Sequence, residues 1–100
     1  MYMIIWEFQV KEEFKAEFIE AYGAAGLWAA LFRRGEGFLG TRLFHDTADP
    51  QRYLTIDQWI SAAAHDAFKE QWTAEYEAID RRCARLTKQE SLLGDFKIGL

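Results

Sequence analysis

Asparagine is absent from this chain of 100 residues, and cysteine and proline occur once each. The single cysteine, Cys83, can form no internal disulfide and cannot supply a zinc or iron–sulfur site by itself. Neither of the two histidines, His45 and His65, has a histidine, cysteine or carboxylate at a recognised ligand spacing. No phosphate-binding glycine loop is present either. We therefore expect a protein without bound metal, flavin or haem, and so without a cofactor.

The sequence also lacks long apolar runs and basic runs. Its longest apolar stretches, such as residues 24–32, are far shorter than the ~20 residues of a membrane span, and no basic segment precedes an apolar one at the N-terminus. The formal net charge is −4, and lysine and arginine never occur in runs longer than two. Attraction to a phosphate backbone or an anionic membrane is therefore not expected. We predict a cytoplasmic protein that binds neither nucleic acid nor membrane.

Apolar residues, in contrast, are abundant. Half of the residues are hydrophobic and 16% are aromatic, which is enough apolar surface to offset the entropy cost of ordering the backbone. A chain of this length forms one hydrophobic core. We expect a single folded domain over residues 1–100.

Hydrophobic periodicity predicts the secondary structure. Alternation predicts strands at 4–10, 37–46, 52–59 and 92–98, and helical spacing predicts helices from 13 to about 23, at 27–32 and at 61–86. Gly35 is predicted to end the second helix in a left-handed cap. Ser61 is predicted to cap the long helical region, which is either one rod or two helices with a bend near Trp72 because Thr73 can cap a fresh start.

The order of these elements is β-α-α-β-β-α-β. It predicts an α+β fold of the ferredoxin-like split βαβ type, with a four-stranded antiparallel sheet and helices on one face. The other face of the sheet then carries apolar side chains such as Ile5, Leu54 and Ile56 without a cover. A second copy of the chain is the natural cover, so we expect a homodimer formed through the sheet.

The strand at 52–59 carries the most informative pattern. Alternation places Tyr53, Thr55, Asp57 and Trp59 on one face. A buried Asp57 would have a pKa raised by desolvation, or would need a cationic partner such as Arg42 or Arg33. In either state Asp57 can take part in proton transfer with a phenolic substrate. The alternative is a structural Asp57 that accepts hydrogen bonds from backbone or arginine, with Trp59 in the core.

Other polar and aromatic residues have two interpretations each. If the hairpin is symmetric about its loop, His45 lies opposite Tyr53 and the two can form a hydrogen-bonded or proton-transfer pair; otherwise His45 is a surface residue at a strand end. The tryptophans and tyrosines either line a slot for a flat aromatic ligand or form an aromatic core. They are Trp6, Trp28, Trp59, Trp72, Tyr22, Tyr53 and Tyr76.

Several segments together resemble a known family. They are the predicted first strand, Phe38-Leu39-Gly40-Thr41, the loop with Asp49-Pro50, and the strand Tyr53-Leu54-Thr55-Ile56-Asp57-Gln58-Trp59 followed by Ser61 and a helix. This pattern resembles the antibiotic biosynthesis monooxygenase (ABM) family of dimeric α/β barrels over nearly the whole chain. The resemblance implies a pocket between sheet and helices, in which dioxygen oxidises an electron-rich phenol or quinol without metal or flavin.

The resemblance carries over residue by residue only in part. Trp59 matches a tryptophan that ends the third strand in many members, which implies a ligand-facing role. The asparagine that catalytic members place on the first strand has no equivalent, since Trp6 or Glu7 stands there. Members that degrade haem use a histidine on the following helix, and His65 lies close to the start of that helix, so haem degradation is disfavoured.

The sequence therefore predicts a cofactor-independent monooxygenase-like protein that oxidises a small phenol, quinol or polyketide-like aromatic. The alternative is a homodimeric domain of the same fold that binds small molecules without catalysis. The candidate catalytic residues are Asp57, Tyr53 and His45. The candidate substrate-binding residues are Trp59, Trp6, Tyr22, Trp28 and Trp72.

Overall fold

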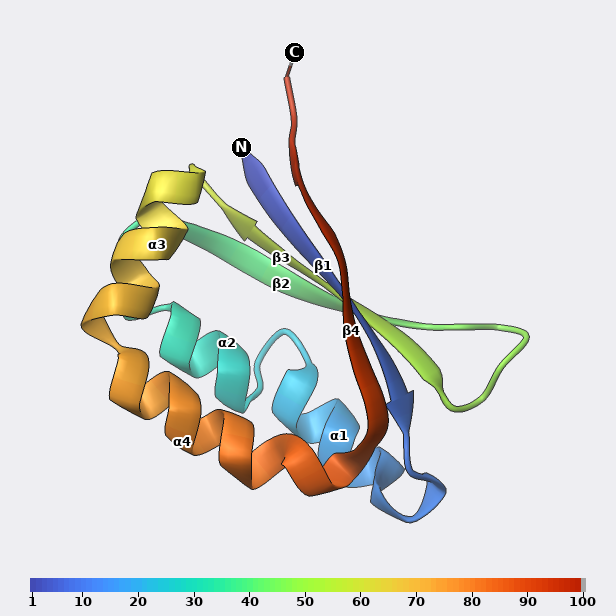
Figure 1. Ribbon diagram of the computed structural model, residues 1–100. Helices are drawn as coiled ribbons and strands as arrows, with labels where there is room; N and C mark the ends of the chain where they lie inside the picture. Colours follow the sequence, from blue (N-terminus) through green and yellow to red (C-terminus); the bar gives the residue numbers. More distant parts are fainter. Residues whose placement is uncertain (100) are drawn as a thin grey trace.

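The computed structural model describes residues 1–99 as an alternation of strands and helices (Figure 1). In chain order the elements are β1 (Tyr2–Val10), the 3-10 turn η1 (Glu12–Phe14), α1 (Lys15–Tyr22), α2 (Leu27–Phe32), β2 (Phe38–His45), β3 (Arg52–Trp59), α3 (Ala62–Gln71), α4 (Thr73–Cys83), the 3-10 turn η2 (Ala84–Leu86) and β4 (Thr87–Lys97). No helix among these residues is long and apolar enough to cross a membrane.

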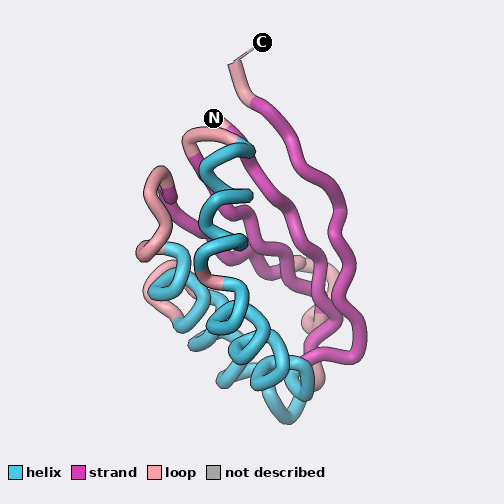
Figure 2. The backbone as a smooth tube through the Cα atoms, turned by 60° about the vertical axis from the view of Figure 1, so that its left-hand side comes forward, coloured by secondary structure: helices cyan, strands magenta, loops and turns pink. Residues whose placement is uncertain are grey.

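The strands form one sheet in the order β2-β3-β1-β4, and every neighbouring pair is antiparallel. All helices lie on one side of this sheet, as Figure 2 shows with helices in cyan and strands in magenta. This arrangement confirms the predicted α+β fold of the split βαβ type. The central strands β1 and β3 pair on both sides, and β2 and β4 are the edges.

The core lies between the sheet and the helices and is mostly aromatic. Alternation on β1 and β3 turns Phe8, Tyr53 and Trp59 toward the helices, and all three are buried. The ring of Phe18 on α1 lies 5.2 Å from each of the Phe8 and Tyr53 rings, measured between centroids. These edge and tilted contacts are favourable beyond the apolar area that they bury.

The predicted helical region at 61–86 forms two consecutive helices. The Ser61 hydroxyl accepts a hydrogen bond from the Ala64 amide at 3.1 Å, so it caps α3 as expected. Thr73, in contrast, does not cap α4: its hydroxyl donates to the carbonyl oxygens of Lys69 and Glu70 at the end of α3. Donation back to the preceding turn competes with the regular helix ladder, and the backbone bends at Trp72.

Two boundary predictions were wrong. Gly35 has no positive φ; the left-handed glycine of this turn is Gly37, with φ of 92°. Gly35 is required for a different reason, since a Cβ there would lie 2.8 Å from ring atoms of Trp59 and Phe68. Strand β4 begins at Thr87, earlier than predicted, because its first residues are polar and show no apolar alternation at the sheet edge.

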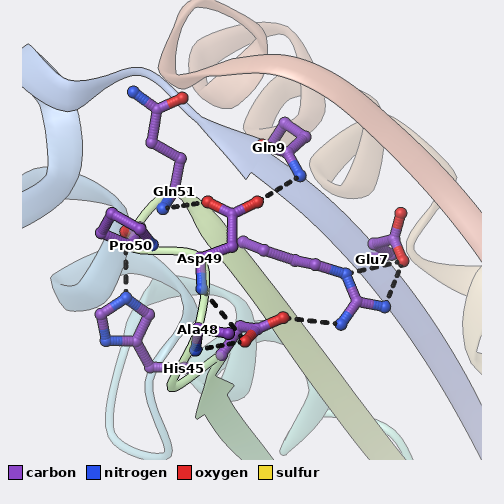
Figure 3. A network of polar contacts seen from close by, with 9 residues as sticks. Glu7, Gln9, His45, Ala48, Asp49, Pro50 and Gln51 are labelled. Carbon is purple, nitrogen blue, oxygen red and sulfur yellow. Dashed lines mark hydrogen bonds and ion pairs between the residues drawn. The ribbon is translucent and has the colours of Figure 1, made fainter.

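Polar contacts hold the β2–β3 loop against β1 (Figure 3). The Asp46 carboxylate accepts hydrogen bonds from the Ala48 and Asp49 amides at 2.7 and 3.2 Å. Arg52 donates to Asp46 at 3.0 Å and to Glu7 of β1 at 2.6 and 3.1 Å. This network joins three segments at the start of β3 and so favours a single register for that strand.

We predict that Gly35→Ala destabilises the protein by about 1 to 3 kcal/mol, because the added methyl group overpacks the contact with Trp59 and Phe68. Urea denaturation of the variant measures the change. The matched control is Glu36→Ala at the neighbouring exposed position, which we expect to stay within about 0.5 kcal/mol of the parent. Equal stability of Gly35→Ala and the parent protein would contradict the close approach.

Candidate functional site

The candidate site is built around Asp57, which β3 turns toward the helices. Its side chain is buried, with 7% of the residue exposed. Thr41 lies opposite Asp57 in the β2–β3 register, and the Thr41 hydroxyl donates a hydrogen bond to Asp57 Oδ1 at 2.5 Å. This is the single side-chain hydrogen bond to Asp57 among residues 1–99.

The expected arginine partner of Asp57 is not found. Arg33 donates instead to the carbonyl oxygen of Ala24 at 2.7 Å. Arg42 pairs with Ile56 in the sheet register, which puts its side chain on the opposite face from Asp57. Asp57 therefore has no arginine partner among the described residues, and the structural interpretation of Asp57 keeps only the hydrogen bond from Thr41.

A buried carboxylate without a cation is a stronger base than an exposed one. Burial raises the pKa of Asp57 to about 6, although the Thr41 hydrogen bond acts in the lowering direction. Desolvation disfavours the charged form of an acid, and one hydroxyl donor only partly compensates for lost water. Asp57 thus changes protonation near neutral pH, where a general base is most effective.

Two hollows flank Asp57 between the sheet and helices α1 to α4, and together we call them the Asp57 cleft. The hollow near Trp28 has a volume of about 40 Å³ and the hollow near His65 about 220 Å³. The two share part of their lining, namely Trp6, Phe32, Asp57 and Tyr76. The larger hollow exceeds the ~150 Å³ of a protein cavity that holds benzene. The Asp57 cleft therefore offers space for a small aromatic ring beside the carboxylate.

Three of the predicted substrate-binding residues line this cleft with Asp57. Trp6, Tyr22 and Trp28 all border the smaller hollow. The Trp28 indole Nε1 is buried and has no hydrogen-bond partner among residues 1–99. Burial raises the pKa of Tyr22 above its usual range, so its hydroxyl stays protonated. The cleft thus combines an ionisable acid, an unpartnered N–H donor and aromatic walls.

The other predicted site residues lie outside the Asp57 cleft. Trp59 has no exposed surface, and its ring packs against those of Phe32, Phe38 and Phe68. Trp72 lies at the bend between α3 and α4, with the Arg34 guanidinium 5.1 Å from its ring centroid. Both tryptophans therefore have protein neighbours where a ligand was expected.

His45 and Tyr53 are paired across the hairpin, as the loop symmetry predicted. Their rings stack with centroids 4.3 Å apart and planes 4° apart, so the pair is not hydrogen-bonded. The imidazole Nε2 instead lies 3.0 Å from the carbonyl oxygen of Pro50. Tyr53 is buried and its hydroxyl has no partner among residues 1–99. Neither residue borders the Asp57 cleft.

Several residues of the cleft were not predicted. Thr41 was within reach of the sequence, because the symmetric pairing that sets His45 opposite Tyr53 also sets Thr41 opposite Asp57. Asp80 on α4 and Glu90 on β4 border the smaller hollow, but no local pattern links them. His65 borders the larger hollow, and burial, followed by the charge of Lys69, lowers its pKa.

A further groove of about 450 Å³ lies between α1, α2 and the end of α4, and no strand residue lines it. Among residues 1–99, no three histidine, cysteine, aspartate or glutamate side chains gather in a way that could hold a metal ion. Unlike this groove, the Asp57 cleft places a buried titratable side chain of the sheet beside aromatic residues.

We predict that Asp57→Asn stabilises the folded protein at pH 7.5. The folded-state pKa of about 6 lies above the ordinary value of 3.8, so the folded state binds more protons and its stability falls as pH rises between these values. Removing the charge recovers about 2 to 3 kcal/mol above pH 6. Urea denaturation at pH 7.5 and pH 3.5 measures the difference.

At pH 3.5 the advantage of Asp57→Asn should become small, because Asp57 is then protonated in the folded wild-type chain and mostly protonated in the unfolded chain. A destabilisation of several kcal/mol at pH 7.5 would contradict an unpaired carboxylate, since that is the result expected when one member of a buried ion pair is removed.

Comparison with solved structures gives close matches in fold. A protein from Deinococcus radiodurans assigned as an antibiotic biosynthesis monooxygenase aligns with a TM-score of 0.76 and 17% identity, over 100% of this chain and 94% of that one. A variant of SnoaB, a cofactor-independent oxygenase from Streptomyces nogalater, aligns with a TM-score of 0.69 and 22% identity, over 99% and 93%. A conserved protein from Methanosarcina mazei aligns with a TM-score of 0.71 and 15% identity, over 96% and 90%.

These identities are low, so the structural matches show the fold alone. A search of curated protein sequences finds no match. The sequence profile of the antibiotic biosynthesis monooxygenase family, in contrast, matches residues 1–82. This range includes strands β1 to β3 and all four α-helices apart from the last residue of α4, and it leaves out β4. The chain belongs to the antibiotic biosynthesis monooxygenase (ABM) family.

Proposed function

We propose that this protein is a cofactor-independent monooxygenase that oxidises a small phenol, hydroquinone or polyketide-like aromatic with dioxygen. The observation that carries the proposal is the environment of Asp57. Its carboxylate is buried beside aromatic walls, has no cationic partner among residues 1–99, and holds a pKa of about 6. Membership of the ABM family supports the same chemistry.

In the proposed reaction Asp57 acts as general base. Thr41 engages Oδ1, which leaves Oδ2 to accept the proton of a phenolic or enolic O–H. The resulting anion is electron-rich and forms a carbon–oxygen bond with dioxygen, which is thereby reduced. The peroxide anion takes the proton back from Asp57, and the hydroperoxide so formed loses water and leaves a carbonyl group. One CH₂ group and one O₂ thus give one C=O group and one H₂O.

The aromatic residues around Asp57 support an aromatic substrate. Trp6, Phe32 and Tyr76 border both hollows of the Asp57 cleft. Flat rings pack well against such walls, and a few polar groups fix their orientation. Trp28 Nε1 offers a hydrogen bond to a carbonyl or hydroxyl oxygen of the substrate. The roles of Trp6, Tyr22 and Trp28 in substrate binding are part of the proposal.

The proposal includes a homodimer formed through the uncovered face of the sheet. On this face Ile5 pairs with Ile56, Phe44 with Leu54 and Met3 with Phe96. Phe44 and Phe96 remain 42% and 48% exposed. An apolar face of this extent, spread over all four strands, fits a second copy of the same sheet. We place this dimer in the cytoplasm, where its one thiol remains reduced.

We predict that Asp57→Asn lowers turnover by about 10²-fold or more, the usual scale for loss of a general base. Oxygen uptake and absorbance with anthrone and hydroquinone substrates measure the rate, without added metal or flavin. In the wild-type protein, kcat/KM should fall as pH drops below about 6, because protonated Asp57 cannot accept a proton.

The matched control is Glu13→Gln, an equal loss of charge at an exposed position outside the cleft. Thermal melts and calorimetric binding of 2-naphthol should show that Asp57→Asn remains folded and binds an aromatic ligand. Wild-type turnover in folded Asp57→Asn protein would end the role of Asp57 as base. Binding of 2-naphthol with no oxygen uptake on any substrate would favour the non-catalytic binding domain.

We predict that Ile56→Glu converts the dimer into a monomer, because it places a charge at the centre of the apolar face. Sedimentation velocity at micromolar concentration measures the change in mass. Ile19→Glu on α1 is the matched control, since Ile19 is exposed on the helical layer and should leave the dimer intact. A monomeric parent protein at the same concentration would refute the dimer.

A further inference from the structure

Two carboxylates flank the smaller hollow of the Asp57 cleft on its solvent side. Asp80 belongs to α4 and Glu90 to β4, two elements joined through η2 at one side of the sheet (Figure 1). Both residues are exposed, and both border the hollow that also contains Trp28 and Asp57. Glu90 pairs with Phe8 in the β1–β4 register, which directs it to the helical face of the edge strand.

The charges of these two residues act on each other and on the cleft. Partial burial, and then the charge of Asp80, raise the pKa of Glu90. The pKa of Tyr76, whose ring borders both hollows, is raised to about 12 by burial and then by the charges of Asp80, Asp57 and Glu90. The Tyr76 side chain is therefore within electrostatic range of all three carboxylates.

Positive charge is scarce in the same region. The two hollows are lined by four carboxylates (Asp57, Asp80, Glu90 and Asp95) and by one lysine, Lys69. Lys69 Nζ lies 4.5 Å from the Tyr76 ring centroid, at the larger hollow. The smaller hollow has no lysine, arginine or histidine in its lining. An anionic group of a ligand would meet like charges there without a compensating partner.

The same hollow contains a donor that suits a neutral oxygen. Trp28 is buried, and among residues 1–99 its Nε1–H makes no hydrogen bond of full geometry, with the Tyr22 hydroxyl and the Cys83 thiol as its weak neighbours. A buried N–H with only weak acceptors is costly, so a ligand that brings a carbonyl or hydroxyl oxygen to it gains a stronger hydrogen bond. The lining thus favours an oxygen acceptor near Trp28 and disfavours a permanent negative charge beside Asp80 and Glu90, in addition to the one that Asp57 creates and neutralises by taking up a proton.

The geometry points to Asp80 and Glu90 as specificity-determining residues that reject substrates carrying a carboxylate at the smaller hollow of the Asp57 cleft and favour uncharged aromatic ones there. This inference rests on the proposed function, because it concerns the substrate of the same cleft. The discrimination works by repulsion, which is the common way to reject a ligand of similar shape. Asp57 adds to the repulsion while it is ionised and ready to accept a proton.

Two probes of equal shape test the inference. They are 6-hydroxy-2-naphthoate, which is anionic, and 6-hydroxy-2-naphthamide, its neutral isostere. We expect calorimetric titration of the wild-type protein at low ionic strength to show binding of the naphthoate about 10-fold or more weaker than binding of the naphthamide. The difference should shrink in 0.5 M KCl, because salt screens charges at an exposed mouth.

The double variant Asp80→Asn with Glu90→Gln should bring the two affinities within about twofold by strengthening the naphthoate alone. The matched control, Glu13→Gln with Glu36→Gln, removes the same net charge at exposed positions outside the cleft and should keep the wild-type difference. Circular dichroism confirms that each variant is folded before titration.

The outcomes separate the inference from the proposed function. Equal affinity of the two probes in the wild-type protein, or an unchanged difference in affinity in the double variant, overturns the selectivity. In that case, oxygen uptake that depends on Asp57 would still support the monooxygenase. Failure of both probes to bind overturns the selectivity and removes the cleft as a ligand site. A difference that disappears only in the Asp80 and Glu90 variant supports the inference.

Discussion

The double pairing of β3, to β2 on one side and β1 on the other, is the constraint on which the rest of the structure depends. Both neighbours fix its register, so each residue of β3 is assigned to one face of the sheet. The pairing sets Thr41 opposite Asp57 and so provides the one hydroxyl that engages this acid. A slip by one residue would exchange the two faces, putting Ile56 among the helices and Asp57 on the open face.

Asp57 is an exception to the way this core is otherwise built. Its neighbours toward the helices are aromatic, and an acid among them costs stability whenever it is ionised. A threonine or valine would fill the same space without that cost. Acids whose pKa is raised toward neutrality by burial are often found at functional sites. A buried carboxylate with few hydrogen bonds is ready to accept a proton from a substrate. The lost stability and the proposed chemistry therefore have the same physical origin.

The sequence was sufficient for the fold because its signals are local. Alternation from Arg52 to Trp59 located β3 to the residue, and Ser61 marked the start of α3. The prediction was wrong where tertiary contact overrides a local signal. Gly35 looked like a left-handed cap, but it is needed for the close approach of Trp59 and Phe68.

The candidate site was predictable only in part for the same reason. The alternation of residues in β3 predicted the face on which Asp57 lies. The alternation in β1 did the same for Trp6. Trp59 shares the face of Asp57, but its position at the end of β3 sets it under α3, where Phe32, Phe38 and Phe68 surround it. Alternation gives the face of a side chain; it does not give its neighbours across the core.

Adjacent residues of β3 therefore serve two separate surfaces. Ile56 contributes to the open apolar face, and Asp57 contributes to the cleft under the helices. The two residues share the backbone of a central strand, so a second sheet packed on the open face would also hold β3 in place beneath the cleft. Because β2 carries Thr41 and β1 carries Trp6, the same packing would steady the hydrogen bond to Asp57 and one aromatic wall. The proposed dimer through the sheet would thus support the position of the proposed base without contributing a residue to its site.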